Sequence, residues 1–250
     1  MCRSRNDTCA LTGPSGNYES RWHAVLLLSA LSAGCGEVSL DATRPSAAQE
    51  NRFSEPFDTL DPNNWGCEYS CPTVSESRAT FTILPGVAPR NEGSWSKIHY
   101  KPQRFTAGSF TVRFALGPRP SEPLWWGVAL YDEGPELDES EYSEIYFGYR
   151  TDGSLSDTQM LLESARFGNA TAIEIETGVD LYDGTFHTGR LVYDSTHIAL
   201  YLDGELLQTI TDTAFIPTAP MSLVLGTRLV EEPVLSDRFD EIIDHCDIEW

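Results

Sequence analysis

The sequence has little positive charge. Its 250 residues include 17 Lys and Arg against 38 Asp and Glu, which gives a formal net charge of −21 at pH 7. Nowhere do Lys and Arg gather into a cluster. Nucleic acids and anionic membrane surfaces attract proteins through such clusters, so we expect no nucleic-acid partner and no membrane contact made by charge alone.

Long apolar runs are also missing. The most apolar stretch, Ala24 to Ala33, follows Arg21 and is shorter than the ~20 residues that a helix needs to span a bilayer core. A short apolar run behind a positive charge is typical of a targeting signal. The sequence therefore predicts that the chain leaves the cytoplasm.

The apolar run ends in the residues Leu31-Ser-Ala-Gly-Cys35. This resembles the lipobox of bacterial lipoprotein signal peptides, which implies a signal peptide over residues 1–34, a lipid anchor on Cys35 and a place in the cell envelope, on the outer membrane or facing the periplasm. Ser32 stands where Leu is commonest, and an ordinary secretory signal that releases a secreted protein is the alternative. Residues 35–52 are small and polar, which predicts a flexible tether.

Few cysteines remain after Cys35. They are Cys67, Cys71 and Cys246, and an exported chain meets an oxidising compartment, so we expect a disulfide. Pairing Cys67 with Cys71 closes a small loop and leaves Cys246 in an apolar strand. The competing arrangement joins Cys246 to one of the other two, and a metal site ranks third because no His lies near Cys67 and Cys71 in the sequence.

No long stretch of helical period and no internal repeat occurs from Phe53 onward. Short apolar segments such as Trp95 to Tyr100 and Phe110 to Leu116 alternate with turns rich in Gly and Pro. This spacing is typical of an all-β protein built as an antiparallel β-sandwich or jelly roll. We therefore predict one such domain over residues 53–250.

Two aromatic strands within residues 124–149 carry the candidate site. Side chains alternate between the two faces of a strand, so Trp126, Val128 and Leu130 form an apolar core face. The opposite face offers rings and one carboxylate, which suits a sugar, whose C–H groups stack on rings and whose hydroxyls form hydrogen bonds. Burial of these rings as core on both sides is the alternative interpretation. The predicted carbohydrate-binding residues are Trp125, Tyr131, Tyr142, Glu144 and Tyr146.

The most specific motif lies further along the chain. It consists of Phe186-His-Thr188, Tyr193, Ile198, Tyr201 and Asp203-Gly204. It resembles the concanavalin A-like domains of family 16 glycoside hydrolases, and weaker likenesses extend over most of the sequence from Phe53. The resemblance implies a concanavalin A-like jelly roll and a polysaccharide or oligosaccharide partner. Within the motif, His187 is interpreted as a structural hydrogen-bonding residue.

Family 16 enzymes are retaining glycosidases that carry the motif Glu-x-Asp-x-Glu, and retention needs both Glu carboxyls. On this sequence the motif falls on Glu144, Tyr146 and Gly148. Glu144 keeps the nucleophile position, but Gly148 has no side chain to act as acid/base. We therefore expect a degenerate cleft that binds glycans without cleaving them. A hydrolase whose acid comes from elsewhere, such as Asp132 or Glu133, is the alternative.

Two further expectations complete the sequence analysis. A structural or protein-binding envelope lipoprotein is the second alternative function. Many family members hold a structural Ca²⁺ beside the closing strand, and the resemblance places its ligand at Asp244. No other cofactor is expected.

Overall fold

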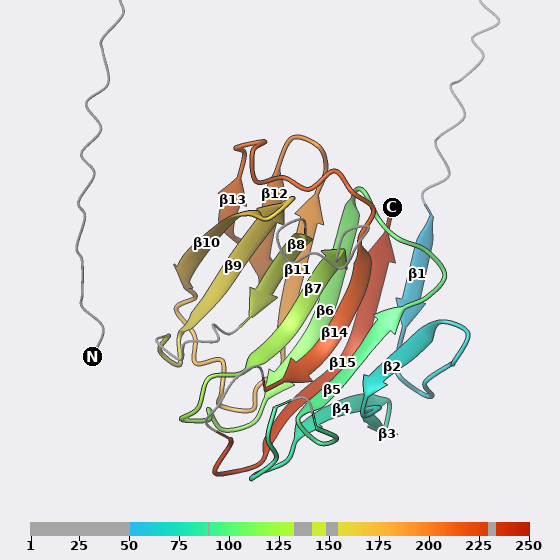
Figure 1. Cartoon of the computed structure of the whole chain (residues 1–250), viewed down its shortest axis with the longest axis vertical. Coiled ribbons are helices and arrows are strands. Elements are labelled where there is room, and N and C mark those ends of the chain that lie inside the picture. The colour runs from blue at the N-terminus through green and yellow to red at the C-terminus, as the bar shows by residue number, and fades with distance from the viewer. Residues whose placement is uncertain (1–50, 90, 133–141, 149–154, 230–233) are drawn as a thin grey trace, which may run out of the picture. The chain divides into compact units, whose positions relative to one another are not determined.

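The computed structural model describes residues 51–89, 91–132, 142–148, 155–229 and 234–250. In this part of the chain the regular structure is entirely β, and two antiparallel sheets lie face to face (Figure 1). The predicted all-β sandwich is thereby confirmed. No helix in these residues is long and apolar enough to cross a membrane. The predicted signal peptide, Cys35 and most of the tether lie outside the described residues.

The larger sheet has eight strands and is organised around β15 (Phe239–Glu249). This strand pairs with β6 (Gly108–Leu116), with β4 (Arg78–Ile83) and with β1 (Arg52–Glu55). The strands that extend the sheet are β11 (His187–Tyr193), β12 (Ile198–Leu202) and β13 (Glu205–Ile210) beyond β6, and β3 (Thr73–Ser75) beyond β4.

The smaller sheet has seven strands. Their spatial order is β10 (Asn169–Glu176), β9 (Gln159–Arg166), β8 (Ser143–Gly148), β7 (Trp125–Asp132), β14 (Ser222–Arg228), β5 (Trp95–Tyr100) and β2 (Trp65–Tyr69). β7 and β8 are the two aromatic strands that the sequence predicts. The sheet places beside them β14 and β5, which are distant in the sequence.

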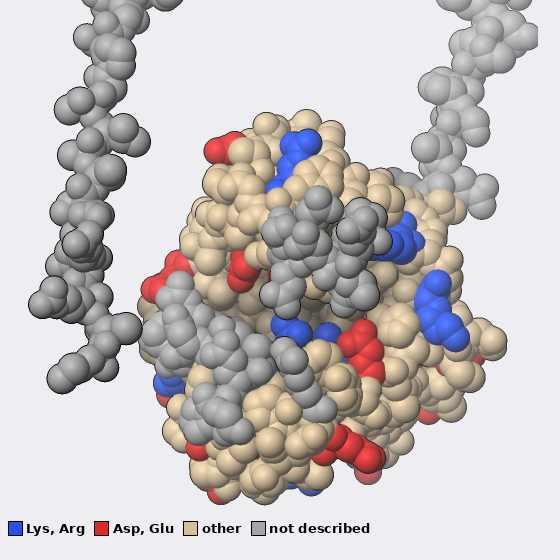
Figure 2. All heavy atoms as spheres, viewed as in Figure 1, with Lys and Arg blue, Asp and Glu red and all other residues tan. Residues whose placement is uncertain are grey.

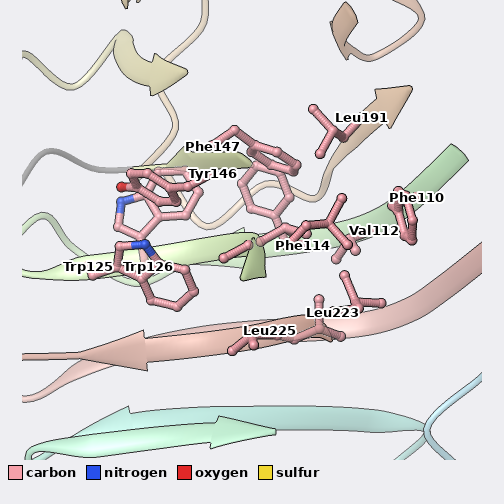
Figure 3. Close-up of a cluster of buried hydrophobic side chains, with 14 of the residues drawn as sticks. Phe110, Val112, Phe114, Trp125, Trp126, Tyr146, Phe147, Leu191, Leu223 and Leu225 are labelled. Atoms are coloured by element: carbon pink, nitrogen blue, oxygen red, sulfur yellow. The ribbon is translucent and has the colours of Figure 1, made fainter. Parts of the chain in front are cut away.

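The core lies between the sheets and follows the alternation of the strands. Every second side chain of β6 and β7 points inward and is at most 1% exposed: Phe110, Val112 and Phe114 on β6, and Trp126, Val128 and Leu130 on β7. Figure 3 shows Val112 and Phe114 meeting Leu223 and Leu225 of β14 across the sandwich. Burial of each such side chain stabilises the fold by ~1.5–3 kcal/mol. The predicted core face of β7 is confirmed.

The predicted hairpin turn at Asp203 and Gly204 joins β12 to β13. Both residues have positive φ angles, 50° and 87°, as a tight hairpin turn requires. The Asp203 carboxylate contacts the ring of His187, with Oδ2 2.8 Å from Nδ1, and accepts a 2.7 Å hydrogen bond from the Thr188 backbone N–H. The structural interpretation of His187 is confirmed.

The cysteines adopt the first of the two arrangements considered from the sequence. Cys67 and Cys71 form a disulfide that closes a loop with a sequence separation of four. Cys246 is free and buried on the core side of β15. This disulfide sits at the outer edge of the smaller sheet, since β2 is its last strand.

The predicted calcium ligand, Asp244, is paired with a cation. Its carboxylate forms an ion pair with Arg113, a neighbour across β15 and β6. The described residues contain no group of three or more His, Cys, Asp or Glu that could hold a metal ion. Arg113 thus lies against the Asp244 carboxylate, and a Ca²⁺ site formed by Asp244 with backbone carbonyls remains a prediction.

One acidic side chain lies between the sheets. Glu241 of β15 is 1% exposed, and its carboxyl accepts a hydrogen bond from the backbone N–H of Gly127 in the opposite sheet. Burial raises its pKa well above the ordinary value, and the hydrogen bond from Gly127 opposes the shift. Glu241 thus joins the centre of the larger sheet to the centre of the smaller one.

Candidate functional site

The outer face of the smaller sheet is hollowed at its centre. A pocket there is lined by side chains from β2, β5, β7, β8 and β14: Glu68, Trp95, Lys97, Trp125, Ala129, Tyr131, Glu144, Val224 and Arg228. Figure 2 shows positively charged atoms next to a negatively charged group in a hollow near the middle of the face in view. The central strands of this sheet also carry several small residues.

Three of these small residues are glycines aligned across adjacent strands. Gly226 of β14 pairs with Gly127 of β7, which pairs with Gly148 of β8. Their φ angles are 120°, 123° and 151°, a range that side-chain-bearing residues rarely adopt. A Cβ at each would lie 2.3, 2.2 and 1.9 Å from a carbonyl oxygen of the neighbouring strand. We call Gly226, Gly127 and Gly148 the glycine row.

The backbone at Gly148 excludes a side chain of any kind, and therefore also a carboxylic acid. A Cβ added to Gly148 would be 1.9 Å from the Trp126 carbonyl oxygen, so no side chain fits there without a backbone shift. The position that the family resemblance assigns to the acid/base is closed by the backbone conformation itself.

Glu144 lies on the predicted face of β8, opposite Tyr131 of β7. It lines the pocket while most of its surface is covered, and burial raises its pKa to about 7. The nearby carboxylate of Glu163 raises that pKa further, whereas Arg228 and Lys97 lower it. Near neutral pH, Glu144 is thus divided between its protonated and ionised forms.

Glu163 is a second carboxylate close to Glu144, and it comes from the next strand. In the β8–β9 register, Glu163 pairs with Tyr146 and Ala165 pairs with Glu144, so the two Glu residues are diagonal neighbours on one face. Diagonal neighbours lie ~7–8 Å apart at Cα, within reach of one another for long side chains. The alternative acid considered from the sequence, Asp132, lies on the other face and pairs with Arg104, and Glu133 lies outside the described residues.

The predicted aromatic residues divide into two pairs. Trp125 and Tyr146 face the predicted side of the sheet, but they are only 4% and 3% exposed because their rings pack together at 5.3 Å. Tyr131 and Tyr142 are partly exposed, with ring centroids 6.5 Å apart. Figure 3 shows Trp125 and Tyr146 next to each other, apart from the core residues of β6 and β14. Trp125 and Tyr131 line the pocket, and a role for any of the four in sugar binding remains a prediction.

Trp95 is a pocket ring that the sequence analysis missed. It lies on β5 and is separated from Trp125 by Arg228 of β14, because Arg228 pairs with Trp95 on one side and with Trp125 on the other. The segment Trp95 to Tyr100 was predicted as a strand. Its place beside β14 depends on strand order, which no local pattern in the sequence records.

Two cations share this part of the pocket. Lys97 lies 5.0 Å from the ring centroid of Trp95 and 5.6 Å from that of Trp125, and Arg228 lies 5.2 and 6.0 Å from the same two centroids. Lys97 also forms a 3.1 Å ion pair with Glu68. Burial is the main cause that lowers the Lys97 pKa, and Arg228 lowers it further, while Glu68 opposes the shift.

Substitution tests the glycine row. We expect Gly148→Ala to destabilise the domain by roughly 2–4 kcal/mol, because it adds a steric clash to an unfavourable φ. Gly178→Ala is the matched control: its φ is also positive, at 75°, but nothing lies within 4 Å of the added Cβ, so only ~1 kcal/mol should be lost. Denaturant unfolding measures both, and equal midpoints for Gly148→Ala and the unsubstituted protein would contradict this account.

Comparisons with known proteins find similarity in fold. No family model and no curated protein matches the sequence. Among solved structures, the β-glucanase of Bacillus licheniformis matches with a TM-score of 0.59 and 15% identity, covering 79% of this chain and 97% of that one. The laminarinase catalytic domain of Thermotoga maritima matches with a TM-score of 0.62 and 14% identity, over 79% of this chain and 96% of that one. The kappa-carrageenase of Pseudoalteromonas carrageenovora matches with a TM-score of 0.57 and 14% identity, over 84% of this chain and 98% of that one. The chain therefore has the jelly-roll fold of family 16-type glucanases.

Proposed function

We propose that this protein binds polysaccharide in the pocket on the outer face of its smaller sheet and holds it at the cell envelope. The observation that carries the proposal is one pocket lined by Trp95, Trp125, Tyr131 and Glu144, on a fold shared with polysaccharide-active enzymes. Closure of the acid/base position at Gly148 supports binding without the family's usual chemistry.

The chemistry of the pocket fits a sugar residue. Rings offer flat apolar surface to sugar C–H groups, while Glu144 and the nearby charged groups offer hydrogen bonds to hydroxyls. Trp125 and Tyr146 are unsuitable for testing glycan binding by substitution, because both are buried. Truncating a packed aromatic ring costs ~3–5 kcal/mol of stability, so a loss of binding could come from unfolding. The partly exposed Trp95 and Tyr131 are the better choices.

We expect Trp95→Ala and Tyr131→Ala each to weaken glycan binding about tenfold, through loss of stacking surface worth ~1–1.5 kcal/mol. Affinity electrophoresis in laminarin and in mixed-linkage β-glucan measures the change. Phe167→Ala is the control, because Phe167 is a 55% exposed ring outside the pocket. Failure of the unsubstituted protein to bind either glycan, or equal losses in all three variants, would count against the proposal.

A second candidate function is glycoside hydrolysis by Glu144 and Glu163. The favouring observation is two neighbouring carboxyls, one with a pKa raised to about 7. Glycosidases keep the pKa values of their two carboxyls apart in this way. The protonated carboxyl gives its proton to the leaving oxygen, and the ionised one acts as nucleophile or base. Here Glu144 would be the proton donor and Glu163 its partner. That assignment exchanges the role that the family resemblance gives to Glu144.

This candidate predicts that the protein releases reducing ends from a β-glucan and that Glu144→Gln and Glu163→Gln each abolish the release. A proton donor must be protonated, so activity should fall as pH rises through about 7, the raised pKa of Glu144. Glu205→Gln, on the exposed edge strand β13, is the control. If the unsubstituted protein binds glucan but releases no sugar at any pH, hydrolysis is excluded and the binding proposal stands.

We also infer that the domain is held in the envelope by a lipid on Cys35. The support is the sequence Leu31 to Cys35 at the end of a short apolar run. In a bacterial host, Cys35→Ala should prevent palmitate labelling and move the full-length protein out of the membrane fraction. Cys9→Ala is the matched control and should change neither. Membrane association that persists in Cys35→Ala would contradict the anchor.

A further inference from the structure

Arg228 is a cation that lies beside two rings of the pocket. It is partly exposed on the pocket wall, and its guanidinium lies over the rings of Trp95 and Trp125 at 5.2 and 6.0 Å from their centroids. Within the part of the chain that the structure describes, the guanidinium makes no hydrogen bond or ion pair. Its donors, which match a planar oxyanion, are therefore available to a ligand.

Lys97 places a second positive charge next to Arg228. The Lys97 side chain is 9% exposed, so much of its hydration is lost, and the positive charge of Arg228 adds to the cost of keeping it ionised. Its only partner among the described carboxylates is Glu68, at 3.1 Å. Two cations and one paired carboxylate leave an excess of positive charge at this end of the pocket.

Glu144 reduces that excess only in part. It lies on β8, on the opposite side of β7 from Arg228, and its carboxylate interacts electrostatically with both cations. The cations on β5 and β14 thus lie between two acidic side chains of the pocket, Glu68 of β2 and Glu144 of β8, and Arg228 forms an ion pair with neither.

We propose that the pocket recognises a negatively charged substituent on the sugar, a sulfate ester or a carboxylate, at Arg228. The substituent's oxygens accept hydrogen bonds from the guanidinium with Lys97 alongside, while the sugar ring lies against Trp95 and Trp125. This inference rests on the proposed glycan-binding function and specifies its ligand class. Because the whole chain carries a charge of −21, long-range electrostatics oppose anionic polymers, and recognition depends on these local contacts.

The experiment compares one polysaccharide in three forms: laminarin, laminarin sulfate and carboxymethyl laminarin, the last two at matched substitution. Isothermal titration at ~0.15 M salt, where charges more than ~8 Å apart are screened, gives the affinity of the full-length protein for each. We expect at least one charged form to bind about tenfold more tightly than laminarin, as a hydrogen bond to a charged group provides. The form that is preferred identifies sulfate or carboxylate as the source of the charge.

Arg228→Gln should remove most of that preference while weakening the binding of neutral laminarin far less, and an unfolding midpoint measured alongside shows that the variant is folded. Arg228→Lys should keep part of it, because charge is retained while the planar donor pair is lost. Arg190→Gln is the matched control: Arg190 lies 5.4 Å from the ring centroid of Tyr201 in the other sheet, far from the pocket in strand order, and its loss should have no effect.

Two results would overturn the inference. One is equal or tighter binding of neutral laminarin by the unsubstituted protein, which leaves the proposed glycan-binding function intact. The other is a charged-form preference that survives in Arg228→Gln. If none of the three polysaccharides binds, the proposed function fails and the inference fails with it, so the two failures are distinguishable.

Discussion

The backbone conformation of the glycine row is the constraint that decides which groups the site can hold. Gly226, Gly127 and Gly148 adopt φ angles that residues with side chains rarely adopt, and a Cβ added to each would meet a carbonyl oxygen of the neighbouring strand. The same conformation leaves the Gly127 N–H to bond Glu241 across the core. The backbone conformation that accompanies this link between the sheets thus also excludes an acid at Gly148.

Around the pocket the chain arranges charge by strand. Cations occupy β5 and β14, between Glu68 of β2 and Glu144 of β8, and the rings of Trp95 and Trp125 lie beside them. Burial shifts the pKa of an acidic and of a basic group in this pocket: it raises the pKa of Glu144 toward neutrality and lowers the pKa of Lys97. A chain with a charge of −21 has kept two of its 17 basic residues in one pocket, where they oppose the surrounding field.

Local patterns in the sequence predicted much of the fold. Alternation placed Trp126, Val128 and Leu130 in the core because a strand's period of two is local, and the Asp203-Gly204 turn followed from the dipeptide itself. For the pocket, the local patterns predicted the residues of β7 and β8 but not those of β5 and β14. Trp95, Lys97 and Arg228 reach Glu144 through strand order, which pairs residues as distant in the sequence as Trp95 and Arg228. The sequence showed that Gly148 lacks a carboxylate, but not that its φ angle excludes one.

The position of β15 has a consequence for how the protein is made. It is the last strand in sequence order, yet it sits inside the larger sheet, paired with β6, β4 and β1. Until it emerges from the ribosome, those earlier strands lack their shared neighbour, and the buried side of Glu241 and Cys246 has no partner surface. The larger sheet therefore cannot close until β15 has been made, so the strands that flank it stay incomplete until then.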